Sequence, residues 1–268
     1  MRIVGVDFTS APKREKPIVV ADCEANENQL VLNRFLEFRD WPAYELWLGG
    51  DDEWVGGFDF PFGLPRRFVE SQGWPANWSG MVRACAAMGK EMFATIAMQA
   101  FQKASTDKDK HRETDLAADS HSPLKTRTNP PVGLMFYEGA WRLFKSDIHI
   151  PALNETGSRK VAVEAYPGLL VKRLRERYYK NDSADSATAN MAARRRLLEH
   201  LRECDSPALS CAVLCTSKKL IEQVSHKSGD WLDAVLCAAQ AHSAWVKRDL
   251  NYGLPQDVDP VEGWIVTA

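Results

Sequence analysis

Two short apolar runs of this chain each lead into a single aspartate. Residues 2–8 read RIVGVDF and residues 54–60 read WVGGFDF, so Asp7 and Asp59 follow residues that favour a buried strand. A carboxylate at the end of a buried strand is costly to desolvate unless a cation or hydrogen-bond donors compensate it. The pattern therefore predicts either a binding site shared by the two strand ends or two ordinary aspartates that close turns.

Two further acidic motifs lie later in the chain. VAVEA, residues 161–165, places Glu164 in a Val-rich run, although strands disfavour glutamate. GDWLDAVLCA, from residue 229, places Asp230 and Asp233 three residues apart, on one face of a helix. Taken alone, Asp230 is an ordinary helix N-cap, and Asp233 favours the helix dipole. One shared site explains all the acidic motifs more simply than a separate structural role for each.

Carboxylates that converge from separate elements are ligands for hard divalent cations. Mg²⁺ prefers oxygen ligands and binds one or two carboxylates together with phosphate oxygens and water. A pair of such ions activates water and stabilises the leaving oxygen in phosphodiester cleavage. We therefore expect two Mg²⁺ or Mn²⁺ ions held by Asp7, Asp59, Glu164, Asp230 and Asp233.

The first third of the chain predicts three strands, one helix and a fourth strand. The expected strands cover residues 2–8, 16–25, 29–38 and 54–60, and polar clusters between the first three favour an antiparallel meander. The helix, at residues 40–50, has Asp40 as its N-cap and glycines at its end. The rest of the chain is mostly helical in pattern. Helices are expected at 79–104, 132–144, 191–204, 217–225 and 229–250, long loops at 105–131 and 181–190, and strands at 161–165 and 264–268.

Composition narrows the class of protein. The chain has 268 residues, a formal net charge of −2 and 45% hydrophobic residues, so its totals favour a globular protein without a large basic nucleic-acid surface. No apolar run is long enough to span a bilayer, and the first residues do not read as a signal peptide. Six scattered cysteines without a CxxC pair predict reduced thiols. We expect a cytoplasmic protein with no membrane partner.

The motifs together resemble a known family. GVDFTSAP, GFDFPFGLP, VEAYPG and DWLDAVLCA, in this order, resemble the domain of unknown function 429 family, whose members are predicted ribonuclease H-like nucleases. DWLDA is also similar to the D-x-x-D-A signature on the final helix of bacterial Holliday-junction resolvases. The resemblance implies an α/β ribonuclease H-like fold, with a mixed sheet of three antiparallel strands and then parallel ones, flanked by helices. It implies one domain over residues 1–268, with a helical and loop insertion at about 74–153.

The resemblance also implies an activity and its residues. It implies a metal-dependent nuclease that hydrolyses phosphodiester bonds in a nucleic acid or nucleotide by two-metal-ion catalysis. Asp7, Asp59 and Asp233 take three catalytic carboxylate roles, and Glu164 or Asp230 takes the fourth. The fourth-strand acid is Asp59, where the resolvases have glutamate. The family's activity is itself predicted, so the resemblance bears on the fold more directly than on the reaction.

Two other functions fit the same fold class. Actin-like ATPases and sugar kinases share this strand order, and Thr9-Ser10 after Asp7 is similar to their first phosphate loop. Phe8 stands against that reading, because it occupies the place where the loop needs a glycine. The other alternative is a catalytically silent binding module that retains the acids for folding.

Basic residues outside the acidic motifs have two interpretations. Arg112, Lys125 and Arg127 in the central loop could clamp a substrate phosphate over the site, or they could form a solvated charged loop. The run Arg194–Arg196 is similarly a solvated helix face or a stripe that binds nucleic acid. The solvated reading is the simpler one in both cases.

Overall fold

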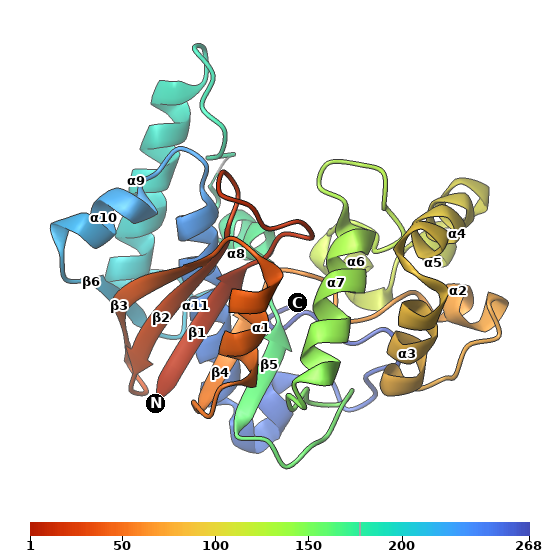
Figure 1. Cartoon of the computed structure of the whole chain (residues 1–268). Coiled ribbons are helices and arrows are strands. Elements are labelled where there is room, and N and C mark those ends of the chain that lie inside the picture. The colour runs from red at the N-terminus through yellow and green to blue at the C-terminus, as the bar shows by residue number, and fades with distance from the viewer. Residues whose placement is uncertain (177) are drawn as a thin grey trace.

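A six-stranded mixed sheet forms the centre of the computed structural model, which describes residues 1–176 and 178–268 (Figure 1). The strand order is β5-β4-β1-β2-β3-β6. Strands β1 to β3 are antiparallel neighbours, β4 and β5 continue parallel to β1, and β6 runs parallel to β3. The strands are β1 (Arg2–Asp7), β2 (Ile18–Ala25), β3 (Gln29–Phe38), β4 (Trp54–Phe58), β5 (Lys160–Glu164) and β6 (Ala212–Cys215). This confirms the predicted mixed sheet and is consistent with a ribonuclease H-like fold.

Helices cover both faces of the sheet. Strand residues alternate between the faces, so Val4 and Val6 enter one hydrophobic core while Ile3 enters the other. The Val4 side is covered by α1 (Trp41–Gly49), α2 (Arg66–Ser71), α3 (Trp78–Met88), α4 (Lys90–Lys103) and α7 (Val132–Lys145). The Ile3 side is covered by α8 (Pro167–Arg173), α9 (Ala187–Glu203), α10 (Lys218–Val224) and α11 (Asp230–Val246).

Helix α11 lies unusually close to the sheet, and glycines permit this approach. A Cβ added at Gly5 in β1 would overlap the carbonyl oxygen of Ala234 and the amide nitrogen of Ala238. A Cβ added at Gly57 in β4 would overlap the carbonyl oxygen of Cys237. The two glycines therefore allow the backbone of α11 to pack directly on β1 and β4, which fixes where the first turn of the helix lies.

The segment between β4 and β5 differs in detail from the expectation. The helix predicted over 79–104 is two helices, because Gly89 between α3 and α4 has a φ of 83°, outside the helical region. The loop predicted over 105–131 contains the short helices α5 (Asp107–Lys110) and α6 (Glu113–Ala118). The sequence does not predict these two helices, because their short and mostly polar segments show little apolar periodicity.

The C-terminal part contains both confirmed and wrong predictions. Helices α9, α10 and α11 were expected, although α9 begins at Ala187, inside the predicted loop. Strand β6 was not predicted, because its four residues are too few for a pattern. Residues 264–268 do not form a strand; Ile265 makes one isolated bridge with Glu164. A distorted helical turn, η1 (Arg248–Gly253), follows α11.

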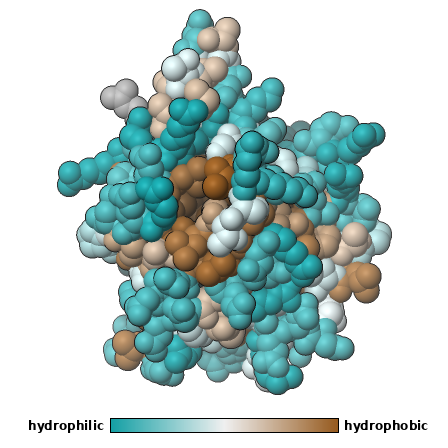
Figure 2. Space-filling view, turned by 90° about the vertical axis from the view of Figure 1, so that its left-hand side faces the viewer, coloured by the Kyte–Doolittle hydropathy of each residue, from teal (hydrophilic) through white to brown (hydrophobic). Residues whose placement is uncertain are grey.

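The surface seen in Figure 2 is largely hydrophilic, with hydrophobic residues gathered around a hollow near its middle. Among the described residues, no helix has the length and apolar character needed to cross a membrane.

Candidate metal centre

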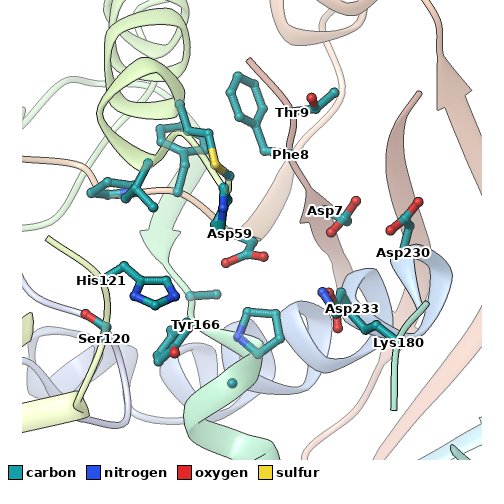
Figure 3. A pocket seen from close by; sticks show the side chains of 18 of the residues that line it. Asp7, Phe8, Thr9, Asp59, Ser120, His121, Tyr166, Lys180, Asp230 and Asp233 are labelled. Atoms are coloured by element: carbon teal, nitrogen blue, oxygen red, sulfur yellow. The ribbon is translucent and has the colours of Figure 1, made fainter. Parts of the chain in front are cut away.

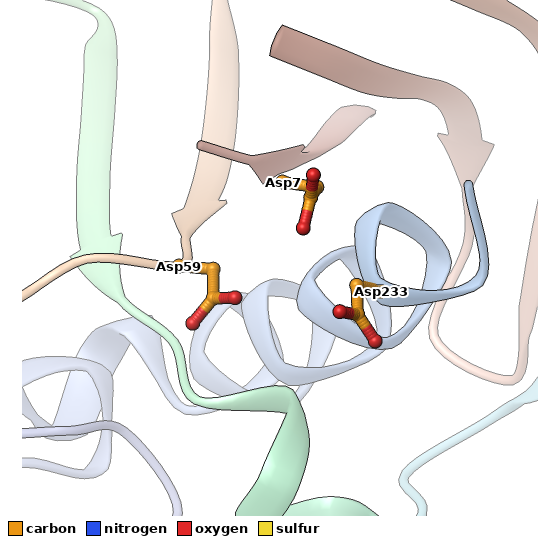
Figure 4. A group of neighbouring side chains, drawn as sticks. All are labelled: Asp7, Asp59 and Asp233. Atoms are coloured by element: carbon orange, nitrogen blue, oxygen red, sulfur yellow. The ribbon is translucent and has the colours of Figure 1, made fainter. Parts of the chain in front are cut away.

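Three aspartates converge at the C-terminal ends of strands β1 and β4 (Figure 4). One carboxylate oxygen each from Asp7, Asp59 and Asp233 can be chosen so that all three lie within 4.8 Å of one another. Asp7 is 6% exposed and Asp233 is fully buried. Oxygen ligands from three carboxylates match the preference of Mg²⁺ and Mn²⁺, so the residues present fit a hard divalent cation.

Strand register brings Asp7 and Asp59 together. Val6 in β1 pairs with Phe58 in β4, and the amide of Asp59 donates to the Val6 carbonyl oxygen at 3.0 Å. Asp7 and Asp59 are each the next residue after this pair. Their side chains therefore leave the two parallel strands on the same face.

The first turn of α11 supplies the third carboxylate. Gly229 precedes the helix with a φ of 82°, a conformation that favours glycine. The amide of Asp233 donates to the Gly229 carbonyl oxygen at 2.8 Å, which closes this turn. Since α11 packs directly on β1 and β4, Asp233 faces the ends of both strands. Asp230, in the same turn of α11, also lies near Asp7, but it does not belong to the group formed by Asp7, Asp59 and Asp233 (Figure 3).

Glu164 does not join the three aspartates. It is the last residue of β5 and pairs in register with Phe58, one position before Asp59. A shift of one residue along a strand places a side chain on the opposite face. The carboxylate of Glu164 accordingly accepts the Phe62 amide at 2.8 Å and two bonds from Arg112, at 2.6 and 2.7 Å.

Arg112 is a buried ion-pair residue, so the reading of a solvated loop is wrong for it. Its side chain is 1% exposed, and besides Glu164 it bonds to Asp115 at 2.7 and 3.0 Å and to the Glu262 carbonyl oxygen at 2.9 Å. These contacts occupy the guanidinium, which leaves little capacity for a substrate phosphate. Arg112 instead ties α6 to the end of β5 and to the C-terminal segment.

The other basic residues considered from the sequence have partners other than the three aspartates. Lys125 sits 5.4 Å from the ring centroid of Phe101, and Arg127 donates to Thr95 Oγ1 at 3.3 Å. Arg194 is buried and paired with Asp182 at 2.8 Å. Neither Lys125 nor Arg127 lines the cavity described below, and Arg194 is not part of a solvated stripe.

Burial makes the aspartate cluster reluctant to ionise. Desolvation, followed by repulsion from Asp230, raises the pKa of Asp7 well above its ordinary value. Desolvation also raises the pKa of Asp59 to about 6. Both shifts mean that the protein pays free energy to hold these carboxylates charged, and a divalent cation is the kind of ligand that relieves this cost.

Two residues that the sequence did not suggest contact Asp233. Tyr179 donates its hydroxyl hydrogen to Asp233 Oδ1, and Lys180 Nζ donates to Asp233 Oδ2. The stem of Lys180 passes over Gly229, where an added Cβ would lie 2.8 Å from Lys180 Cγ. Lys180 also lowers the pKa of Asp7 and of Asp59 by its charge, in opposition to their burial. It is therefore an internal counter-ion of the cluster.

A cavity of about 640 Å³ opens beside the aspartates (Figure 3). Asp7, Asp59 and Asp233 line one end, together with Lys180. Its walls also come from the β1–β2 connection, the start of α7 and the start of α8. The aspartate group is therefore open to a ligand of small-molecule size.

Phe8 does not belong to a phosphate loop. It is 3% exposed, and its ring centroid lies 4.6 Å from that of Phe60. A core aromatic here leaves no glycine at which the backbone could approach a phosphate. The packing of Phe8 weighs against a kinase-like reading.

Comparison with known proteins identifies a family. A model of the family described as "Protein of unknown function (DUF429)" matches residues 5–259. No curated protein and no solved structure gives a significant match to this chain.

Proposed function

The chain belongs to the DUF429 family, and from this membership and the aspartate geometry we propose that it is a metal-dependent, ribonuclease H-like phosphodiesterase. Its substrate in this proposal is a nucleic acid or nucleotide, and its cofactor is Mg²⁺ or Mn²⁺, with two ions. The chain acts as one cytoplasmic domain, in which about residues 74–153 are an insertion beside the site.

The observation that carries the proposal is the convergence of Asp7, Asp59 and Asp233 from three separate elements. Three nearby carboxylates repel one another, and burial adds to that cost, so a purely structural role gives no reason to retain all three. A divalent ion held between them would supply a Lewis acid for the phosphate and would lower the pKa of a bound water.

The protein residues have distinct roles in this proposal. Asp7, Asp59 and Asp233 would hold the cation, and all three line the cavity. Glu164 is a positioning residue. By accepting the Phe62 amide it fixes the chain that follows Asp59, and by pairing with Arg112 it fixes the segment that bears α6. Lys180, 30% exposed, lines the cavity beside Asp233 and is a cation for an incoming phosphate.

Hydrolysis of bis(p-nitrophenyl) phosphate and of a short single-stranded oligonucleotide, each with Mn²⁺, tests the proposal. The wild type should cleave at least one of them, and Asp59→Asn should reduce the rate by a hundredfold or more. Asp52→Asn is the matched control, because Asp52 is exposed and paired only with Arg2 in the described structure. Cleavage that is insensitive to EDTA, or equal in the wild type and Asp59→Asn, would contradict the proposal.

A further inference from the structure

The cavity beside the aspartates is much larger than a metal site requires. Its volume of about 640 Å³ lies within the range of roughly 300–1,000 Å³ that is typical of pockets for small organic ligands. In Figure 3 the carboxylates of Asp7 and Asp233 lie on one side, and His121 and Tyr166 lie on the other, beyond Asp59. The metal ligands therefore occupy one end, and the other end is available for the rest of a substrate.

Tyr166 forms part of that other end and is held in a defined orientation. Its amide donates to Gln240 Oε1 at 3.1 Å. A Cβ added at Gly168 would lie 2.7 to 2.9 Å from three atoms of the Tyr166 side chain, so the ring lies directly against this glycine. Burial, with repulsion from Asp59, raises the pKa of Tyr166 to about 12, which keeps the phenol neutral beside the carboxylates.

The segment between β4 and β5 also contributes apolar side chains. Pro131, Val132 and Met135, at the start of α7, line the cavity, and all three are partly buried. Phe60 also lines it, with its ring packed against Gly139 of α7. A wall of this kind suits a flat aromatic group better than a charged phosphate chain.

Two polar side chains complete this end. Ser120 donates to Asp115 at 2.7 Å, and its hydroxyl oxygen can still accept a hydrogen bond. The His121 imidazole makes no hydrogen bond within the part of the chain that the structure describes. Burial lowers the pKa of His121, so it is neutral at pH 7 and offers one donor and one acceptor. Such groups can read the edge of a nucleobase.

Four Lys and Arg side chains of the described chain line the cavity, too few to follow a long polyanion. Lys16 and Lys180 act on the charges of Asp7 and Asp59 at the metal end, where they suit a single phosphate group. Arg112 is occupied by Glu164 and Asp115, and Lys172 is paired with Asp119 at 2.6 Å. Duplex binding normally uses several phosphate contacts from Lys and Arg.

We propose that this cavity binds one nucleotide unit, with its phosphate at the three aspartates through the divalent metal and its base between Tyr166 and the start of α7. The substrates are then small nucleotides that contain a phosphodiester bond, or the terminal nucleotides of a single strand, rather than the interior of a duplex; AMP stands for the nucleotide unit that the cavity holds. This inference rests on the proposed function, because it assigns the substrate class of the same site.

Calorimetric titration with AMP and with ribose 5-phosphate, both with Mn²⁺ present, tests the inference. AMP should bind the wild type at least tenfold more tightly than ribose 5-phosphate, because only AMP carries a base. Val132→Trp, which fills the base end, should weaken AMP binding at least tenfold while Mn²⁺ and ribose 5-phosphate affinities stay unchanged. Met92→Trp is the matched control: Met92 lies in α4, is 57% exposed and does not line the cavity.

A second variant covers the case in which Val132→Trp does not fold. Tyr166→Leu keeps an apolar side chain but removes the stacking ring, so it should weaken AMP binding about tenfold or more. Equal binding of AMP and ribose 5-phosphate, unchanged AMP binding in the variants, or tighter binding of a 20-base-pair duplex than of AMP would overturn the inference. Mn²⁺ binding and phosphodiesterase activity are separate readouts, so their loss would identify a failure of the proposed function instead.

Discussion

Lys180 donates a hydrogen bond from its ammonium group to Asp233, the most deeply buried of the three clustered aspartates. The ammonium therefore stands at the edge of a group of carboxylates whose other members, Asp7 and Asp59, are held at raised pKa values by burial. A cation supplied by the chain and a divalent ion would compete for the same oxygens. Lys180 therefore opposes metal binding at Asp233.

Removal of the Lys180 ammonium should strengthen metal binding. In Lys180→Met we expect Mn²⁺ to bind severalfold more tightly at pH 8, because the ion no longer displaces a charged partner of Asp233. The metal-free variant should be less stable, since Tyr179 is then the one side-chain partner left to Asp233 among the described residues. Calorimetry and thermal unfolding with EDTA measure the two effects. Lys172→Met, which removes the partner of exposed Asp119, should change neither; weaker Mn²⁺ binding in Lys180→Met would refute the competition.

A methyl group at residue 5 should disturb both the fold and the metal site. Gly5→Ala should lower the free energy of unfolding by about 2 kcal/mol or more, because the added Cβ meets the backbone of α11. A loss of this size is typical of substitutions that overpack a core. The displaced helix should carry Asp233 away from Asp7 and weaken Mn²⁺ binding. Urea unfolding and Mn²⁺ titration are the measurements. Gly49→Ala is the control, because nothing lies within 4 Å of an added Cβ there.

Breaking the Arg112–Glu164 ion pair should lower the free energy of unfolding. Arg112→Met leaves Glu164 and Asp115 buried without their cation, which should cost about 3–5 kcal/mol of stability in urea unfolding. The double variant Arg112→Met/Glu164→Gln should lose less than the sum of the single variants, because the two residues interact directly. Arg67→Met provides a control: its pair with Asp109 is solvent-exposed on the Arg67 side and should contribute little to stability. Additive losses would contradict a direct interaction.

The aspartate cluster should make the metal-free protein less stable as the pH rises. Burial raises the pKa of Asp59 to about 6, whereas an unfolded chain ionises this group near 4. The folded state therefore holds a proton that the unfolded state releases, so this contribution to stability is full below about pH 4 and is lost as the pH passes 6. At about 1.4 kcal/mol per pKa unit, the loss for Asp59 is up to about 3 kcal/mol.

The difference between the wild type and Asp59→Asn isolates this contribution from other titrating groups. In urea unfolding with EDTA, the wild type should lose more stability than Asp59→Asn between pH 4.5 and pH 8. Mn²⁺ affinity should change in the opposite direction and rise with pH, because the ligands must be deprotonated. Parallel stability profiles of the two proteins would show that Asp59 is not strained by burial.

The parts of the site that could be predicted depend on local pattern. Asp7 and Asp59 follow apolar strand runs, and Asp233 lies one turn into an apolar helix, so each position could be inferred from its own segment. Glu164 has the same local pattern, but strand register places its side chain on the opposite face. Register depends on pairing between distant segments, which a single run of residues does not reveal.

The remaining site residues depend wholly on tertiary structure. Lys180 and Tyr179 lie in a polar connection without periodicity, where nothing local indicates a contact 53 or 54 residues away. Arg112 sits in a charged segment that reads as solvated, yet its partners are Asp115 nearby and Glu164 far along the chain. Gly5 in the GVD run and Gly57 in the GGFD run are the sequence signal for the close approach of α11. The sequence does not say which helix packs on these glycines, so the approach itself could not be predicted.

Mn²⁺ titration of the wild type and Asp7→Asn by calorimetry shows whether the three aspartates form a metal site. At pH 8 the wild type should bind Mn²⁺ with millimolar or tighter affinity, and Asp7→Asn, which keeps the shape of the side chain but removes its charge, should lose this binding. Asp22→Asn, a buried aspartate that is paired with Arg2 and Arg34 away from the cluster, should bind Mn²⁺ as the wild type does. Absence of Mn²⁺ binding in the wild type, or equal binding in the wild type and Asp7→Asn, would contradict the account.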